Sequence, residues 1–275
     1  MKKRSFLFFV IISTFLLILS ACGTSSSKDA TSTEGEESSE KNSLRIVTNA
    51  AYAPFEYFDG DKIVGFDVDL INALAEETGY EVEIEHVGWD PIFVEIESNR
   101  ADLSIGAITI NDERKQTFDF SHPYFLSTNK ILVPEDSAIQ SGEELKGHIV
   151  AVQTGTTGSE AVEKLLGKNH KDIKKFEDNN IAIQELLQGG AAAVVADNTV
   201  VEEYVKNNSD QKLKVVEDSS SFEQEFYGFM FPKGSKLKAE FDQALNTLYD
   251  NGTYVEIYEK WFGVEPNLET LKEQQ

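Results

Sequence analysis

The strongest constraint on the fold of this 275-residue chain is an alternation of short apolar strands with amphipathic helices, which begins at residue 44. Leu44–Thr48 is rich in branched apolar residues, and Phe66–Gly79 has the apolar periodicity of a helix that ends at a glycine. Apolar residues alternate with glutamates over Glu81–Glu85, as in a half-buried strand. A helix opened by Asp90-Pro91 and a strand over Ala101–Ile110 complete the order β-α-β-α-β.

The same alternation restarts at His148 and predicts a second sheet with helices of its own. The strands expected there are His148–Gln153, Ile173–Phe176 and Ala191–Ala196, and the helices are Ser159–Leu166 and Asn180–Gln188. A strand over Tyr227–Phe231 and helices over Lys236–Tyr249 and Gly252–Trp261 follow. Two helix-covered sheets indicate an α/β fold with two lobes. Ligands of open α/β sheets bind beyond the carboxyl ends of strands, so the loops after these strands are the places to search.

The first residues predict export. Met1–Arg4 carries three positive charges and Phe6–Leu19 is almost wholly apolar, which is the pattern of a signal peptide. The apolar run is shorter than the roughly 20 residues needed to span a bilayer. It leads into Leu-Ser-Ala-Cys22, which resembles the lipobox of bacterial lipoproteins. We therefore expect a signal peptide over residues 1–21 and a lipid on Cys22; an ordinary signal peptide or an uncleaved anchor are the alternatives, and either would also place the domain outside the cytoplasm.

Composition excludes several classes of protein. Residues 22–43 are mostly Ser, Thr, Glu and Gly, which predicts a flexible linker behind the anchor. The net charge of −23 makes nucleic acid an implausible partner. One cysteine cannot form an intramolecular disulfide, and the four histidines show no metal-ligand spacing, so neither a metal nor a cofactor is expected.

Four motifs occur in order along residues 44–263: Ala53-Pro54-Phe55-Glu56, Gly65–Leu70 (GFDVDL), Ile108–Arg114 (ITINDER), and Asn251–Tyr254 (NGTY) leading to Trp261-Phe262-Gly263. Together they resemble the polar amino acid binding proteins of ABC importers, solute-binding protein family 3. The resemblance covers nearly the whole of the α/β region.

The resemblance implies a type II periplasmic-binding-protein clam shell, with two mixed sheets flanked by helices and two hinge crossings. The crossings are expected near Ser127–Val133 and Glu223–Tyr227. Lobe 1 would then comprise residues 44–130 and 226–264, and lobe 2 residues 131–225, with a polar tail over 265–275. A monomer that works with a permease and an ATPase is the expected assembly.

A buried free amino acid must have both of its backbone charges paired, because burying an unpaired charge costs several kcal/mol. Arg114 suits the carboxylate, since a guanidinium can bond both oxygens. The resemblance assigns Arg114 to the α-carboxylate and Thr109 to a ligand contact through its N–H and hydroxyl. The alternative is a surface arginine paired with Asp112 or Glu113.

Lobe 2 offers three further candidates. Gln153–Ser159 joins a strand to a helix, and its small residues have N–H groups that could face an anion. The segment lacks the Lys-Ser/Thr ending that a nucleotide-binding phosphate loop requires. The resemblance implies that Thr157 helps to bind the carboxylate and that Gln153 lines the side-chain pocket. It assigns Asp197, at the end of an apolar strand, to the α-ammonium. Asp197 could also serve as the N-cap of the helix that follows.

The resemblance places Tyr52 and Trp89 as aromatic rings around the ligand side chain, and Gly106 and Ala107 as backbone contacts to the ammonium. Alternatively, Tyr52 and Trp89 are ordinary core aromatics, and Gly106 and Ala107 are simply small residues at the junction of a strand and a loop. Asn49 departs from the family, which usually carries Asp at this position. Because an amide both donates and accepts, Asn49 suits a neutral polar terminus, with Glu56 or water as other partners for a cation.

The predicted function is capture of a polar amino acid for import, with arginine or another basic amino acid first and glutamine second. An enzyme of the dehydratase type is one rival, but Ser127–Lys130 fits Ser-x-x-Lys without its companion motifs, and no Gly-x-Ser-x-Gly elbow occurs. A sensory receptor component is the other rival, and it would need a separate signalling partner.

Overall fold

The computed structural model describes residues 43–275, and their strands form two separate main sheets. The predicted signal peptide, Cys22 and nearly all of the linker lie outside the described residues. The first sheet has the order β5-β1-β6-β14-β7. Its strands are β1 (Ser43–Thr48), β5 (Glu81–His86), β6 (Leu103–Ser104), β7 (Phe118–Phe120) and β14 (Met230–Pro232).

The first β-α-β unit of this sheet is built as the alternation predicts. β1 pairs with β5 in parallel, from Ser43 opposite Glu81 to Thr48 opposite His86. The crossover between them is α1 (Phe66–Thr78), which buries its apolar face and ends at Gly79 in a left-handed conformation. The helix α2 (Trp89–Glu97) follows β5 and packs against β1 and β14.

The second main sheet has the order β10-β9-β11-β8-β12. Its strands are β8 (Phe125–Pro134), β9 (Val150–Gln153), β10 (Ile173–Phe176), β11 (Ala193–Asp197) and β12 (Leu213–Val216). The helices beside it are α4 (Thr157–Leu166), α5 (Asn179–Leu187), α6 (Asn198–Asn207) and the short turns η1 (Glu143–Leu145) and η2 (Ser209–Gln211). Because β8 and β12 run antiparallel to their neighbours and β9 to β11 run parallel, the sheet is mixed.

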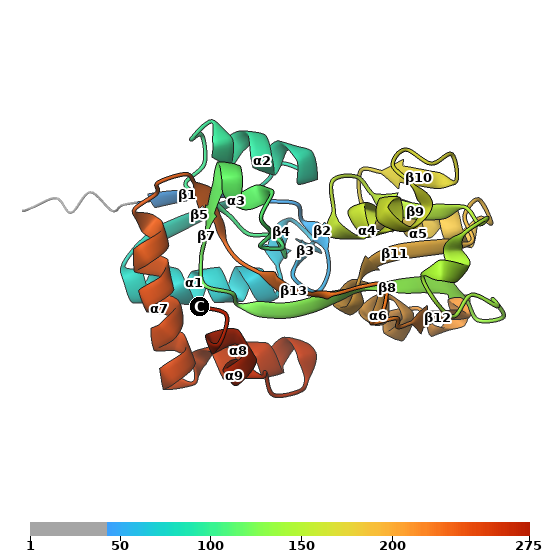
Figure 1. Cartoon of the computed structure of the whole chain (residues 1–275). Coiled ribbons are helices and arrows are strands. Elements are labelled where there is room, and N and C mark those ends of the chain that lie inside the picture. Colours follow the sequence, from blue (N-terminus) through green and yellow to red (C-terminus); the bar gives the residue numbers. More distant parts are fainter. Residues whose placement is uncertain (1–42) are drawn as a thin grey trace, which may run out of the picture. The chain divides into compact units, whose positions relative to one another are not determined.

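Two adjacent strands connect the sheets (Figure 1). β8 places Phe125 in the core of the first lobe and Ile131 and Val133 in the core of the second. β13 (Gln224–Tyr227) pairs with it antiparallel, with Tyr227 opposite Phe125. The chain therefore crosses between lobes on one two-stranded ribbon, which gives the two hinge crossings of a type II clam shell. The lobe boundaries given above stay predictions.

The C-terminal helices cover the first lobe. α7 (Leu237–Asn251) and α8 (Thr253–Phe262) both pack against α1. The segment expected as a polar tail contains another helix, α9 (Leu268–Lys272), whose Leu271 is buried in the same core. Two leucines in a mostly polar segment, Leu268 and Leu271, gave too weak a periodicity to predict this helix.

Two predicted strands differ from the observed ones. The strand expected over Ala101–Ile110 is only β6, because the chain turns into the site at Gly106 with φ of 149°. The strand expected over Tyr227–Phe231 is divided, since β13 pairs with β8 and β14 joins the first sheet. The break at Gly228 lies against Ile110, where an added Cβ would come within 2.8 Å of a side-chain carbon.

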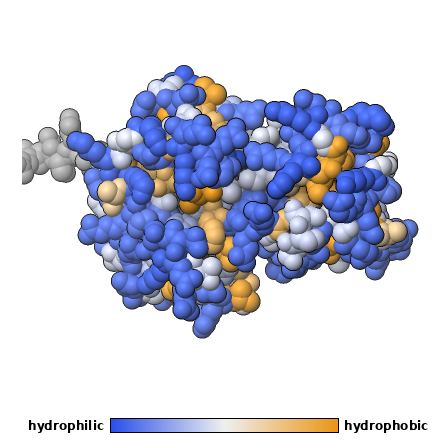
Figure 2. Space-filling view, in the orientation of Figure 1, coloured by the Kyte–Doolittle hydropathy of each residue, from blue (hydrophilic) through white to orange (hydrophobic). Residues whose placement is uncertain are grey.

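A small third sheet was not predicted. It consists of β2 (Ala51–Tyr52), β3 (Glu56–Asp59) and β4 (Lys62–Val64), and it carries Tyr52 toward the second lobe. The remaining helix, α3 (Arg114–Thr117), is a single turn that begins at Arg114. Within residues 43–275, no helix combines the length and apolar character needed to cross a bilayer. The face shown in Figure 2 is mostly hydrophilic, with small apolar areas.

Candidate functional site

Nine of the ten residues proposed as ligand contacts line one small cavity between the lobes, of about 10 Å³. Lobe 1 contributes Tyr52, Trp89, Gly106, Ala107, Thr109 and Arg114, and lobe 2 contributes Gln153, Thr157 and Asp197. Thr156 also lines this cavity and was not predicted. Asn49 lines a neighbouring, larger cavity that shares Trp89 with the first. The structure thus brings the predicted residues together, and their contact with a ligand stays a proposal.

Arg114 is a buried guanidinium that reaches across the cleft. Its Nη1 donates to the carbonyl oxygen of Thr109 at 2.8 Å, and its Nη2 donates to the carbonyl oxygen of Gly155 at 3.2 Å. The rings of Trp89 and Phe93 lie 5.7 and 5.4 Å from its central carbon. Burial lowers the pKa of Arg114, although nearby carboxylates oppose that shift. A surface pair with Asp112 or Glu113 is therefore not its environment.

Asp197 faces Arg114's cavity from the other lobe, at the carboxyl end of β11. Its Oδ2 accepts hydrogen bonds from the hydroxyls of Tyr52 and, at 2.6 Å, Tyr227. Asp197 occupies the N-cap position of α6, but its side chain makes no capping hydrogen bond. Burial raises the pKa of Asp197, while the two tyrosines and Arg114 oppose that rise. The carboxylate is thus directed into the cleft rather than toward the helix.

Glu225 is a third charged group at the site, and sequence reasoning missed it. Its Oε2 accepts from the hydroxyls of Thr109 at 2.7 Å and Thr157 at 2.8 Å, which belong to opposite lobes. Its Oε1 accepts from Nδ2 of Asn129 at 2.6 Å. Burial, and then the charge of Asp197, raise the pKa of Glu225 to about 7. The only signal in the sequence was its place in the hinge crossing expected near Glu223–Tyr227.

Asp67 fixes the loop that carries Gly106 and Ala107. Its Oδ2 accepts from their backbone N–H groups at 3.0 and 3.1 Å and from the hydroxyl of Tyr124 at 2.8 Å. Burial raises the pKa of Asp67 to about 6, although these three donors lower it. The pKa of the adjacent buried Glu56 is raised well above its usual value by burial and by Asp67. Glu56 is 1 % exposed and lines neither cavity, so it is not placed to meet a ligand side chain.

The lobe 2 loop is held by its own polar groups. Oε1 of Gln153 accepts from Asn179 at 2.9 Å, and Nε2 of Gln153 donates to the carbonyl oxygen of Glu177 at 3.1 Å. Thr156 is the N-cap of α4, where its hydroxyl accepts from the backbone N–H of Ser159 at 3.2 Å. Thr157 therefore begins a capped helix whose N-terminus faces the cleft, which favours negative charge there.

Two arrangements that catalysis could use do not form among residues 43–275. No group of three or more His, Cys, Asp or Glu that could hold a metal occurs in this part of the chain. The Ser-x-x-Lys pattern does not assemble a pair, because Ser127 contacts Asn198 at 3.0 Å while Lys130 contacts Glu202 and Glu217 at 2.7 and 2.8 Å.

The fold and the charges facing the cleft define a two-lobed solute-binding protein, and comparison with known proteins agrees. Residues 44–264 match the family described as bacterial extracellular solute-binding proteins, family 3, and the chain belongs to this family. It is 38% identical to a "Probable histidine-binding protein" of Neisseria gonorrhoeae, over 90% of this chain and 92% of that protein. It is 35% identical to the "Arginine-binding extracellular protein ArtP" of Bacillus subtilis, over 95% and 98%.

Among solved structures, the arginine-, lysine-, histidine-binding protein ArtJ of Geobacillus stearothermophilus is 51% identical, with a TM-score of 0.83. The match covers 84% of this chain and 100% of that one. These three relatives are named as binding proteins and not as enzymes.

Proposed function

We propose that this protein captures a free basic amino acid in the interlobe cleft, with arginine preferred and glutamine next. The observation that carries the proposal is the placement of Arg114 and Asp197 on opposite lobes around one cavity. Every free amino acid carries a carboxylate and an ammonium, and this pair of protein charges matches them. Side-chain preference is supported by the relatives, which are named for arginine, histidine and lysine.

Capture would proceed by closure of the two lobes. The cavity around Arg114 and Asp197 is too small for an amino acid, so entry requires the lobes to separate on the β8–β13 ribbon. The ligand carboxylate would take hydrogen bonds from Arg114, Thr109 and Thr157, and the two threonine hydroxyls would turn from Glu225 to the ligand. The ligand ammonium would lie between Asp197 and the Gly106–Ala107 loop. Closure then buries both charges together, which makes each charged hydrogen bond stronger than in water.

Delivery to a membrane importer completes the proposed function. Family membership supports an extracytoplasmic location. The Leu-Ser-Ala-Cys22 sequence supports a lipid anchor on Cys22 at the outer face of the cell membrane. The partners would be the permease and the ATPase of an ABC importer, served by a monomeric binding protein.

A thermal-shift panel tests the binding half of the proposal. The purified protein, residues 23–275, is heated with each of the twenty amino acids, ornithine, citrulline or cystine. A ligand at about 100 times its Kd stabilises the native state by roughly 2.7 kcal/mol. We expect arginine to give the largest rise in the unfolding midpoint and glutamine to follow the basic amino acids. The absence of a shift with any amino acid would refute the proposal.

Uptake measurements test the import half. Deleting the gene should reduce entry of labelled arginine into cells, and restoring it should recover entry. Unchanged uptake together with a lost response to external arginine would instead identify a receptor component.

A further inference from the structure

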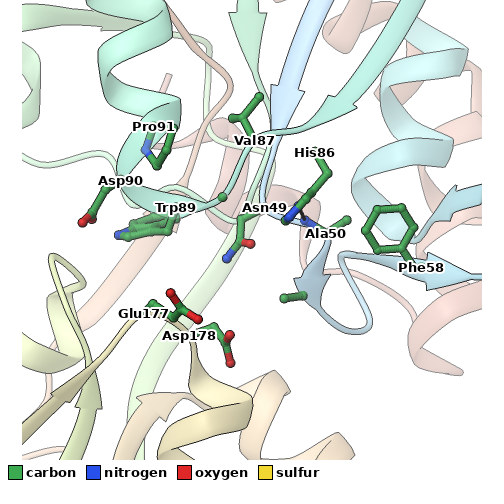
Figure 3. A pocket seen from close by; sticks show the side chains of 12 residues that line it. Asn49, Ala50, Phe58, His86, Val87, Trp89, Asp90, Pro91, Glu177 and Asp178 are labelled. Carbon is green, nitrogen blue, oxygen red and sulfur yellow. Dashed lines mark hydrogen bonds between the residues drawn. The ribbon is translucent and has the colours of Figure 1, made fainter.

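A second cavity adjoins the cavity of Arg114 and Asp197, and its lining differs in charge. It has a volume of about 470 Å³ and shares Trp89 with its smaller neighbour. Both lobes line it, lobe 1 through the segment that starts α2 and lobe 2 through the segment before α5 (Figure 3). The larger cavity is thus the space that a long ligand side chain could enter from the smaller one.

Three carboxylates line the larger cavity: Asp90 from lobe 1, and Glu177 and Asp178 from lobe 2. None of its lining residues is a lysine or an arginine. In Figure 3 the side chains of Glu177 and Asp178 lie across the cavity from Asn49 and Trp89. Both lobes therefore contribute negative charge to the lining of this cavity.

Asn49 is a second and independent sign that a polar group is received here. The residue is only 5 % exposed, and its side chain extends into this cavity (Figure 3). Its amide has no hydrogen-bond partner among residues 43–275; only its backbone carbonyl is bonded, by the N–H of Ala51. The residue is buried but its amide is open to the cavity, so the amide is left to bond whatever enters there.

We infer that this cavity receives the end of the ligand side chain and that Asp90, Glu177 and Asp178 select a positively charged end, a guanidinium or an ammonium. The inference rests on the proposed function, and it explains how the site would distinguish a basic side chain from a neutral one. The carboxylates replace the negative charge that Asn49 does not provide. The side-chain oxygen of Asn49 accepts a hydrogen bond from the same cation, and the alkyl chain passes along Trp89.

Solvent limits the strength of this selection. Asp90 and Glu177 are exposed and Asp178 is half-buried, so water and salt screen their attraction for a cation. Each exposed ion pair contributes little alone, and the selectivity comes from several carboxylates acting on one charge. We therefore expect that removing two of the carboxylates weakens the preference for a cationic side chain by about tenfold, which is equivalent to about 1.4 kcal/mol.

Calorimetric titration with arginine and citrulline tests the inference, because citrulline has the same chain length with a neutral end. The test variant combines Glu177→Gln with Asp178→Asn. Asn is used at position 178 because Oδ1 of Asp178 caps α5 through the N–H of Ile181, and Asn can cap equally well. Glu177→Gln alone, at a residue whose side chain caps no helix, is the second variant. Asp210→Asn with Glu256→Gln removes the same charge from two exposed residues outside the cavity.

In the test variant we expect arginine to bind about tenfold more weakly, with citrulline affinity unchanged. Glu177→Gln alone should give a smaller loss in the same direction. An arginine-to-citrulline ratio equal to that of the wild type would overturn the inference and leave the proposed function standing. An equal loss in the distant control would also overturn it, since the long-range field would then be the cause. If the wild type bound no amino acid at all, the proposed function itself would fail.

Discussion

Arg114 shows how one side chain can join two lobes. Its guanidinium donates to backbone carbonyls on both sides of the cleft, at Thr109 and Gly155. It lies close to aromatic rings and within the field of several carboxylates. A charge held in this way is matched to an anion that enters between the lobes.

Replacing Arg114 by alanine should abolish binding of every amino acid. Each charged hydrogen bond contributes about 1.5 to 3 kcal/mol, so loss of two should weaken binding by roughly 100-fold or more. Calorimetry with arginine, lysine and glutamine measures the effect. Arg100→Ala is the matched control, because Arg100 is an exposed arginine paired with Glu95 outside both cavities. Near wild-type affinity in Arg114→Ala would show that the guanidinium does not bind the ligand.

Glu225 makes stability depend on pH. Because its pKa is raised from 4.5 to about 7, the folded protein holds this proton more tightly than the unfolded chain does. The stabilisation is therefore complete below pH 4.5 and is lost as pH rises through about 7. We expect the unfolding midpoint to fall between pH 4.5 and pH 8 by more in the wild type than in Glu225→Gln. Equal falls in the two proteins would contradict the account of Glu225.

At the residue scale, the sequence alone could predict the ends of strands but not the partners found across the cleft. Arg114 and Asp197 stand in motifs or directly after an apolar strand, so their positions could be found. Glu225 could not be assigned, because its partners Thr109, Thr157 and Asn129 are distant in the chain and come together only in the fold. Asp67 lies in the GFDVDL motif, but its role could not be predicted, since its bonds to residues 106 and 107 join distant segments.

At the element scale, the helix α1 depends on a backbone conformation that only glycine adopts easily. Gly65 precedes the helix with φ of +147°, and an added Cβ would lie 1.9 Å from the carbonyl oxygen of Phe55. This close approach sets β3 and its neighbours beside α1, next to the site.

Gly65→Ala should therefore destabilise the protein by more than about 3 kcal/mol. Gly60→Ala is the control, because Gly60 also has a positive φ, +62°, but has nothing within 4 Å of an added Cβ. We expect that substitution to cost about 1 kcal/mol. Urea unfolding of the two variants and the wild type measures the difference. A similar loss of unfolding free energy at both positions would show that the close contact with Phe55 is not what makes Gly65 necessary.

Regular elements were predicted better than irregular ones. The strand Ile173–Phe176 and the helices near residues 66, 159 and 180 follow from apolar periodicity. The three-stranded sheet around Tyr52 and the break at Gly228 did not, because both are set by tertiary contacts rather than by local pattern.

At the scale of the whole molecule, the two lobes are α/β units joined by the β8–β13 ribbon (Figure 1). Each lobe contributes a charged side chain to the cavity between them, Arg114 from lobe 1 and Asp197 from lobe 2. The sequence predicted two sheets from two runs of alternation, and family resemblance supplied the discontinuous first lobe. Which charges would meet could not follow from the pattern alone, because Arg114 and Asp197 are far apart in the chain.

The central claim is that both backbone charges of one amino acid are neutralised at once, by Arg114 from one lobe and Asp197 from the other. The most direct test is calorimetric titration of the wild-type protein with arginine, with agmatine and with Nα-acetylarginine. Agmatine lacks the carboxylate and Nα-acetylarginine lacks the ammonium, while all three keep the guanidinium. The account predicts tight binding of arginine and a loss of roughly 100-fold or more for each analogue. Binding of agmatine or Nα-acetylarginine as tight as that of arginine would contradict it.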